Sequence, residues 1–175
     1  MSKVNAEFKA IPFILYHEDQ DSFTVGDEAR EFLQGLRVAR LGVIAIAGKY
    51  RTGKSLFLNQ LVGAEPNQGF GVGNSVNACT KGLWLYTRLL TCRDSHKQSF
   101  PALVIDTEGI GSLDANSTHD TKIFALAMLL ASFFVYNSVG SIDENSIQNL
   151  SLVTPHAYLI FTRFKNDRKS LLQAN

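Results

Sequence analysis

Apolar residues fall in short runs that alternate with polar stretches, and two periodicities can be distinguished. Continuous apolar runs bounded by turn residues are typical of strands buried in a sheet, whereas apolar residues three or four positions apart are typical of amphipathic helices. Strands are predicted at residues 13–16, 41–47, 83–90, 101–105 and 133–136. Helices are predicted at residues 28–38, 55–62, 122–132 and 143–153. This alternation predicts an α/β fold in which helices cover both sides of a mostly parallel sheet.

Individual residues set the boundaries of several elements. Pro12 has no backbone donor, so it is expected at the start of the first strand or on a sheet edge. Asp27 is the candidate N-cap of the first helix. Gly63 is expected to end the second helix. Three leucines of that second helix are expected to pack inward: Leu56, Leu58 and Leu61.

A short polar turn at residues 93–99 joins the strands predicted at 83–90 and 101–105. Neighbouring strands joined by so short a turn are expected to run antiparallel. The sheet is therefore predicted to be mixed, with most of its strands parallel.

Composition and charge narrow the function classes. The 175 residues are 45% hydrophobic and 19% charged, which is typical of one globular domain. A net charge of +1 favours neither nucleic acid nor an anionic membrane as partner. The longest apolar stretch, residues 123–136, is shorter than the ~20 residues that span a bilayer, so we interpret it as a buried helix followed by a buried strand. A polar N-terminus and only two cysteines, Cys79 and Cys92, favour a cytoplasmic, reducing location without a signal peptide.

The segment between the strand at 41–47 and the following helix has the pattern G-x-x-x-x-G-K-S. Gly48 and Gly53 permit backbone conformations that a Cβ would forbid. Such a loop can turn its N–H groups around phosphate oxygens, beside the positive end of the following helix. In this pattern Lys54 reaches the β- and γ-phosphates and the Ser55 hydroxyl binds Mg²⁺. The alternative is a glycine turn that merely joins a strand to a helix.

A second candidate element, Asp106-Thr107-Glu108-Gly109, ends the strand predicted at 101–105. In phosphate-loop hydrolases an acid at this place holds the Mg²⁺ shell, and a glycine N–H can bond the γ-phosphate. The alternative is ordinary turn chemistry after a strand. The position of this element about fifty residues after the phosphate loop favours the first interpretation.

Two further residues have candidate roles. Thr80 is a candidate switch hydroxyl on Mg²⁺, and the alternative is a loop threonine that caps its own backbone. Arg51, inside the phosphate loop, is a candidate arginine finger that neutralises charge in the transition state. The alternative for Arg51 is a solvent-facing side chain.

Four segments carry a family resemblance: GKYRTGKS, NSVNACTKGLWLY, LVIDTEGIGS and FALAMLLASFFVYNSVGSI. Over about residues 11–154 the chain resembles the GTPase domain of guanylate-binding proteins and their atlastin relatives. The resemblance implies the three-layer fold of P-loop NTPases in a dynamin-related large GTPase. It also implies GTP binding with Mg²⁺, hydrolysis to GDP and phosphate, and homodimerisation through the nucleotide face of the loaded domain.

The resemblance implies roles residue by residue. Arg51 matches the internal arginine finger, Glu108 the residue that helps arrange the attacking water, and Lys54 the phosphate-binding lysine. The Mg²⁺ ligands are expected to be Ser55, Thr80 and Asp106. Nucleotide contacts are expected from Gly48, Lys49, Tyr50, Arg51, Thr52, Gly53, Lys54, Ser55, Leu56, Thr80, Asp106 and Gly109.

The sequence departs from the family pattern in two respects. Ala78 stands where some members carry a catalytic serine. The Arg-Asp element with which the family reads guanine has no match, because Thr162–Asp167 comes too early and is wrongly spaced. We therefore expect a partial GTPase domain at residues 1–154, C-terminally truncated, and a divergent tail at residues 155–175.

Two other functions stay open at this point. A non-catalytic nucleotide-binding or interaction fragment is favoured by the missing guanine element. An NTPase without base preference would be distinguished by comparing GTP with ATP turnover. An enzyme is favoured over the non-catalytic fragment by the presence of Arg51, Lys54, Ser55, Thr80 and Glu108.

Overall fold

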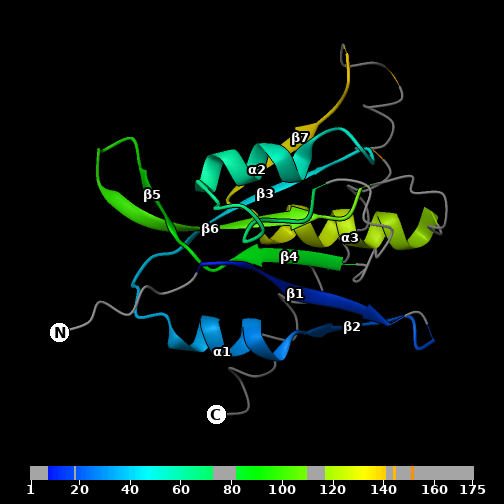
Figure 1. Ribbon diagram of the computed structural model, residues 1–175, viewed down its shortest axis with the longest axis horizontal. Helices are drawn as coiled ribbons and strands as arrows, with labels where there is room; N and C mark the ends of the chain where they lie inside the picture. Colours follow the sequence, from blue (N-terminus) through cyan, green and yellow to red (C-terminus); the bar gives the residue numbers. More distant parts are fainter. Residues whose placement is uncertain are drawn as a thin grey trace, which may run out of the picture.

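The computed structural model describes residues 8–17, 19–72, 82–109 and 117–140, together with residues 144 and 151. Three helices and seven strands lie in these ranges (Figure 1). The strands are β1 (Ala10–His17), β2 (Ser22–Val25), β3 (Gly42–Gly48), β4 (Gly82–Tyr86), β5 (Leu90–Arg93), β6 (Ser99–Thr107) and β7 (Phe133–Asn137). The helices are α1 (Asp27–Gly35), α2 (Lys54–Val62) and α3 (Ser117–Leu130).

The strands form a single sheet in the order β2-β1-β4-β6-β3-β7, with β5 pairing with β6. The predicted α/β fold is therefore confirmed. Strand β3 runs parallel to both of its neighbours, β6 and β7. The other four pairings are antiparallel, so the expectation of a mostly parallel sheet is right for β6, β3 and β7 but not for the rest of the described sheet. Two of these antiparallel pairings, β1 with β2 and β5 with β6, join strands that follow each other directly along the chain, and a short connection of that kind cannot join parallel strands.

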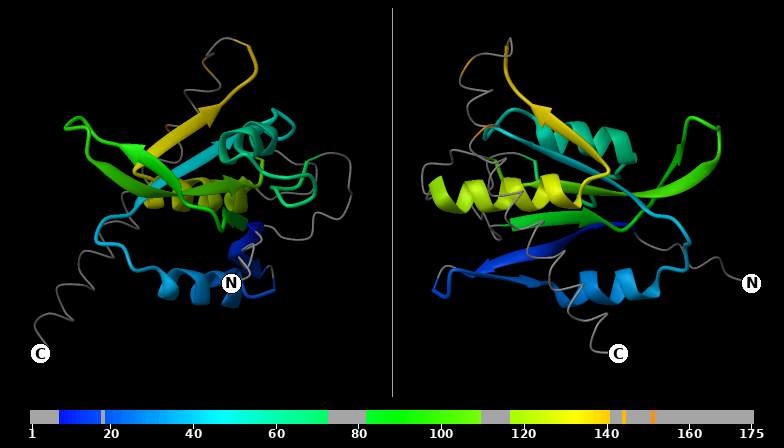
Figure 2. Two further views of the ribbon diagram at one scale, coloured as in Figure 1. Left: turned by 60° about the vertical axis from the view of Figure 1, so that its left-hand side comes forward. Right: turned by 180° about the vertical axis from the view of Figure 1, so that it is seen from behind.

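Two core clusters cover the two faces of the sheet, as alternation along each strand requires. On one face, Ala45 and Ile105 lie in a cluster with Ala29 of α1 and Ile123 of α3. On the other face, Ile46 and Val104 pack against Leu58 and Val62 of α2. In the right-hand view of Figure 2, which is seen from behind, α3 lies in front of the sheet and α2 lies on its far side. The three-layer arrangement predicted from the sequence is thus observed in the described residues.

The first strand and helix differ from their predicted bounds. β1 pairs with β2 only from Ile14 onwards, so Pro12 lies where β1 is locally an edge, as expected. The prediction missed β2 altogether. Asp27 is not the N-cap: Gly26 is, and a Cβ there would lie 2.6 Å from the Pro12 carbonyl oxygen. Close packing on β1 therefore selects glycine at the cap, and Asp27 becomes the first helical residue, where its charge suits the helix dipole.

The strand predicted at 83–90 is two strands, β4 and β5. Both pair antiparallel with β6, and the polar turn between β5 and β6 is confirmed. Helix α3 begins earlier than the predicted residue 122, and it leads into β7 as the apolar stretch indicated. The predicted helix at 143–153 lies outside the described residues except at positions 144 and 151.

The prediction that three leucines of α2 pack inward is right for one of them and wrong for the other two. Leu58 is fully buried, but Leu56 and Leu61 are 51% and 41% exposed. The buried positions are Lys54, Leu58 and Val62, which are four residues apart and therefore share one face of the helix. Gly63 caps the helix in a left-handed conformation, as predicted. Across the described ranges, every helix is too short or too polar to cross a bilayer.

Candidate functional site

The phosphate loop connects the end of β3 to the start of α2. Three of its residues have positive φ: Gly48 at 150°, Arg51 at 58° and Gly53 at 85°. The first helical hydrogen bond runs from the Phe57 N–H to the Gly53 carbonyl, at 2.9 Å. The preceding N–H groups of the helix have no helical acceptor and are free for a ligand. Loop and helix together therefore present backbone donors at the positive end of α2.

The interior of the loop is organised around one carbonyl oxygen. The Lys54 Nζ donates to the Lys49 carbonyl at 3.0 Å, and the Thr52 hydroxyl donates to the same oxygen at 2.8 Å. Lys54 is buried, and burial lowers the pKa of its ammonium group, while the charge of Asp106 acts in the opposite direction. A buried cation held beside free backbone donors is what binding of a polyphosphate requires.

The half-buried Ser55 and the buried Asp106 form a hydrogen-bonded pair beside Lys54. The Ser55 hydroxyl donates to Asp106 Oδ2 at 2.6 Å, and the Thr107 N–H donates to Oδ1 at 3.0 Å. Burial raises the pKa of Asp106 to about 6, although the Ser55 bond, the charge of Lys54 and the Thr107 bond all lower it. A hydroxyl and a carboxylate are hard oxygen donors of the kind that Mg²⁺ prefers, so these two residues fit the cation.

Residues 108 and 109 bring the end of β6 against the phosphate loop. A Cβ on Gly109 would lie 2.4 Å from the Tyr50 Cα and 3.0 Å from the Lys54 Nζ. Only glycine allows so close an approach. The Glu108 N–H donates to the Gly82 carbonyl at 3.3 Å, which ties this turn to the start of β4. The sequence-predicted residues of the two elements are therefore adjacent in space.

Three other predicted site residues lie on the surface of the loop and helix. Tyr50 and Leu56 are 46% and 51% exposed, and Arg51 is exposed as well. The Arg51 guanidinium carbon lies 5.4 Å from the centroid of the Tyr50 ring. Thr80 and Ala78 lie outside the described residues, as do the Thr162–Asp167 segment and the whole of 155–175.

Asn137 is a site residue to which the sequence analysis gave no role. It pairs with Gly48 in the parallel β3–β7 register. Its Nδ2 donates to the Thr52 carbonyl at 2.9 Å and contacts the Thr52 Oγ1 at 3.0 Å. The available signal was its position at the end of β7, because the carboxyl ends of neighbouring parallel strands meet at one edge of a sheet.

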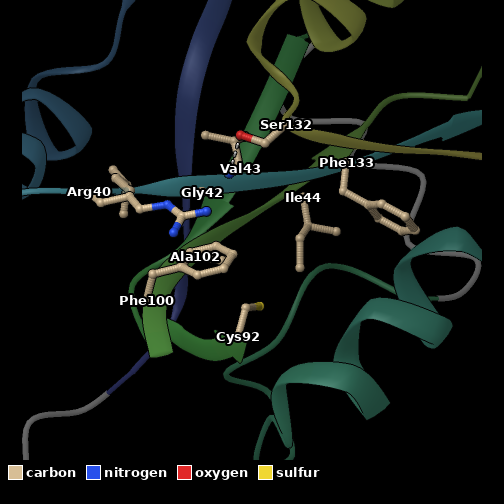
Figure 3. Close-up of a pocket in the computed structure, with 10 residues that line it drawn as sticks. Arg40, Gly42, Val43, Ile44, Cys92, Phe100, Ala102, Ser132 and Phe133 are labelled. Carbon is tan, nitrogen blue, oxygen red and sulfur yellow. Dashed lines mark hydrogen bonds between the residues drawn. The ribbon is translucent and has the colours of Figure 1, made fainter. Parts of the chain in front are cut away.

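A cavity of about 450 Å³ lies away from this site, at the start of β3 rather than its end (Figure 3). Arg40 stacks on one of its walls, with the guanidinium carbon 4.2 Å from the Phe100 ring centroid. The same guanidinium donates to Asp94 at 2.6 Å. Since the cavity shares no residue with the phosphate loop, it is not part of the candidate nucleotide site.

Comparisons with known proteins agree with the geometry of the loop. The family model described as guanylate-binding protein, N-terminal domain, matches residues 20–175. Guanylate-binding protein 4 from Homo sapiens is 38% identical over 150 residues, which cover 85% of this chain and 22% of that protein. Guanylate-binding protein 5 from Mus musculus is 37% identical over 157 residues, which cover 89% and 25%.

The chain spans about a quarter of the length of these relatives. The family match covers most of the chain, and the two relatives align with 85% and 89% of it. The chain belongs to the guanylate-binding protein family.

Proposed function

We propose that this chain binds GTP with Mg²⁺ and hydrolyses it to GDP and phosphate. The observation that carries the proposal is the hydrogen bond of 2.6 Å between the half-buried Ser55 and the buried Asp106, beside the buried Lys54 at the start of α2. This is the combination of cation ligands and phosphate-binding groups that phosphoryl transfer uses. Membership of the guanylate-binding protein family supports GTP as the nucleotide.

Phosphate binding is assigned to the loop and the first turn of α2. The backbone of residues 48–56 supplies N–H donors, and Lys54 supplies the charge opposite the β- and γ-phosphates. Gly109 lies against Tyr50 and Lys54, so its N–H is close enough to the loop to bond the γ-phosphate. The close approach of the two elements supports this assignment.

Cation binding is assigned to Ser55 and Asp106, with Thr80 as the proposed third ligand. Bound Mg²⁺ would neutralise negative charge on the β- and γ-phosphate oxygens. The buried carboxylate of Asp106 supports the assignment, because a cation would favour the charged form that burial disfavours.

Hydrolysis transfers the γ-phosphoryl group to water: the bond from Pγ to the bridging oxygen breaks, GDP leaves, and the proton of the attacking water passes to the phosphate product. Glu108 is proposed to orient the attacking water. Arg51 is proposed to stabilise the charge that develops on the phosphoryl oxygens, as an arginine finger supplied in cis.

The test is binding of a fluorescent guanine nucleotide with Mg²⁺, with GTP and ATP as competitors, followed by phosphate release. Displacement by GTP but not by ATP is expected, and Lys54→Ala should abolish binding. Lys9→Ala is the matched control, because Lys9 is an exposed lysine whose ammonium forms a surface ion pair with Glu28 of α1. No binding by the wild-type chain at high micromolar nucleotide would refute the proposal and leave a non-catalytic fragment. Equal displacement by ATP would point to an NTPase without base preference.

The proposed partner is a second copy of the chain, joined through the face that carries the loop when GTP is bound. Exposed Tyr50 and Leu56 on that face support this proposal, as does the family relationship. Light scattering should give twice the monomer mass with a non-hydrolysable GTP analogue and the monomer mass with GDP. A monomer in both states would contradict it.

A reducing, cytoplasmic location is proposed as well. Cys92, in β5, is a free thiol. Free cysteines persist where glutathione and thioredoxin keep thiols reduced. Fractionation of cells that express the chain, with thiol labelling of Cys92, tests this, and recovery of the chain in a secretory compartment would contradict it.

A further inference from the structure

Asn137, at the end of β7, contacts the phosphate loop through both its backbone and its side chain. The β3–β7 register places it opposite Gly48, the first residue of the loop. A Cβ on Gly48 would lie 2.0 Å from the Asn137 carbonyl oxygen, so the two backbones are in direct contact. From this position the Asn137 side chain reaches four residues further along the loop and donates to the Thr52 carbonyl.

The bond to the Thr52 carbonyl fixes the direction of an N–H group. In a planar trans peptide the C=O and the N–H point to opposite sides. When the Thr52 carbonyl points towards Asn137, the N–H of Gly53, which belongs to the same peptide, must point away from β7. That N–H precedes α2 and has no helical acceptor, so it is one of the donors available to a phosphate oxygen.

The Thr52 hydroxyl links Asn137 to a second part of the loop. It donates to the Lys49 carbonyl at 2.8 Å and lies 3.0 Å from the Asn137 Nδ2, which acts as its donor. The Lys49 carbonyl also accepts the Lys54 ammonium. A chain of hydrogen bonds therefore runs from β7 through the loop to the phosphate-binding lysine.

We propose that Asn137 is a positioning residue for the phosphate site: it orients the Thr52–Gly53 peptide so that the Gly53 N–H faces the β-phosphate. The inference rests on the proposed function for its ligand, since it assigns a further residue to the same nucleotide site. A donor is required at position 137, because both of its contacts on Thr52 are acceptors.

The experiment compares Asn137→Ala, Asn137→Asp and wild type in the 175-residue chain. GDP and magnesium pyrophosphate are the two probes, and the second contains no base. Asn137→Ala should weaken both by about tenfold, the effect of one hydrogen bond with good geometry. It should also shift the ³¹P resonance of the bound β-phosphate and the amide resonance of Gly53. Gln34→Ala, which removes an exposed carboxamide on α1, is the matched control and should change neither.

Asn137→Asp adds a pH readout. The carboxylate keeps the shape of the amide but cannot donate, so binding should be weaker than in Asn137→Ala at pH 8. A protonated carboxyl can donate again, so the ratio of the two dissociation constants should approach one or reverse by pH 5. The effects of other titrating groups, which are the same in both variants, cancel in this ratio of dissociation constants.

The measurements distinguish failure of the proposed function from failure of the inference about Asn137. If wild type binds pyrophosphate but shows no preference for guanine, the proposed function fails while the role of Asn137 is still measured. Unchanged affinity and unchanged resonances in Asn137→Ala would overturn the inference, and so would a lower melting temperature with unchanged affinity. Failure of wild type to bind either probe would overturn both.

Discussion

Asp106 is almost fully buried, and burial raises its pKa to about 6 from an ordinary value of 3.8. Between these two pH values the native chain binds more protons than the unfolded chain. The free energy of unfolding therefore falls as pH rises through this window, and the full cost of the buried charge is present above pH 6. Ser55, Lys54 and Thr107 reduce the cost without removing it.

Replacing Asp106 with Asn tests this cost. Without Mg²⁺ at pH 7.5, Asp106→Asn should raise the free energy of unfolding by up to about 3 kcal/mol, the equivalent of the pKa change. At pH 3 the two chains should be equally stable, because the carboxyl is protonated in both states. Urea denaturation at the two pH values measures the difference.

Asp94→Asn is the control for that prediction. The hydrogen bond from Arg40 holds the pKa of Asp94 below its usual range, so its contribution has the opposite sign. It stabilises the chain above pH 4 and is lost as pH falls. Asp94→Asn should therefore be destabilising at pH 7.5. A loss of stability in both variants at that pH would contradict the assignment of a buried charge cost to Asp106.

Arg51 is exposed and has a left-handed backbone within the loop. Arg51→Ala should lower kcat for GTP by about 10³-fold and change GDP affinity by only a few-fold, because a finger acts on the transition state. Arg51→Lys, which keeps the charge but loses the planar fork, should recover part of the rate. Stopped-flow binding and phosphate release separate the two effects. Equal losses in affinity and kcat would make Arg51 a ground-state phosphate ligand instead.

At this scale the sequence was sufficient to predict which residues lie close together beside the loop, where their spacing follows from a local motif. The positions of Lys54 and Ser55 follow from the pattern of the loop, and that of Asp106 from its place near the carboxyl end of β6. Asn137 could not be assigned, because its bond to Thr52 joins positions 85 residues apart in the sequence and depends on the register of β3 with β7. Register is a property of the packed sheet rather than of either strand alone.

Among the elements, β3 was the most predictable because an apolar strand buried on both faces has few alternatives. β2 was missed because its four residues, SFTV, are too few to show an alternation. The strand predicted at 83–90 was too long because Leu89 and Leu90 continue its apolar run, whereas the observed strand ends at Tyr86 and Leu90 begins β5, which pairs with a different part of β6. Leu56 and Leu61 were misjudged because the buried face of α2 is set by Lys54, a charged residue.

The contact of β3 with β7 gives a prediction for Gly48. Gly48→Ala places a Cβ on the Asn137 backbone at a positive φ, so it should lower the free energy of unfolding by about 2–4 kcal/mol. Thermal and urea denaturation measure the change.

The matched control is Gly35→Ala, at the end of α1. A Cβ on Gly35 has nothing within 4 Å, so this substitution should raise stability by about 0.5–1 kcal/mol. Equal effects of the two substitutions would show that the close approach at Gly48 does not limit packing.

For the whole molecule, the fold class and the layers were predictable because the chain alternates strand and helix signals. The mixed character of the sheet was only partly predictable, because direction depends on the connections between strands. The division at residue 154 stays a prediction.

Ligand binding should stabilise the whole chain. GDP with Mg²⁺ at 100 times its dissociation constant should add about 2.7 kcal/mol and raise the melting temperature by roughly 5–10 °C. Differential scanning fluorimetry measures the shift. Lys54→Ala should show none, and an equal shift in that variant would mean that the ligand binds elsewhere.

Strand β7 carries Asn137, and among the described strands it pairs with β3 alone. A polypeptide that pairs with the other edge of β7 would restrict the motion of this strand and, through Asn137, would stabilise the loop conformation that we propose binds phosphate. Coupling of this kind is reciprocal: if edge pairing tightens nucleotide binding by some factor, nucleotide tightens edge pairing by the same factor. The occupancy of the proposed nucleotide site would then be detected as a change in affinity at that edge of β7.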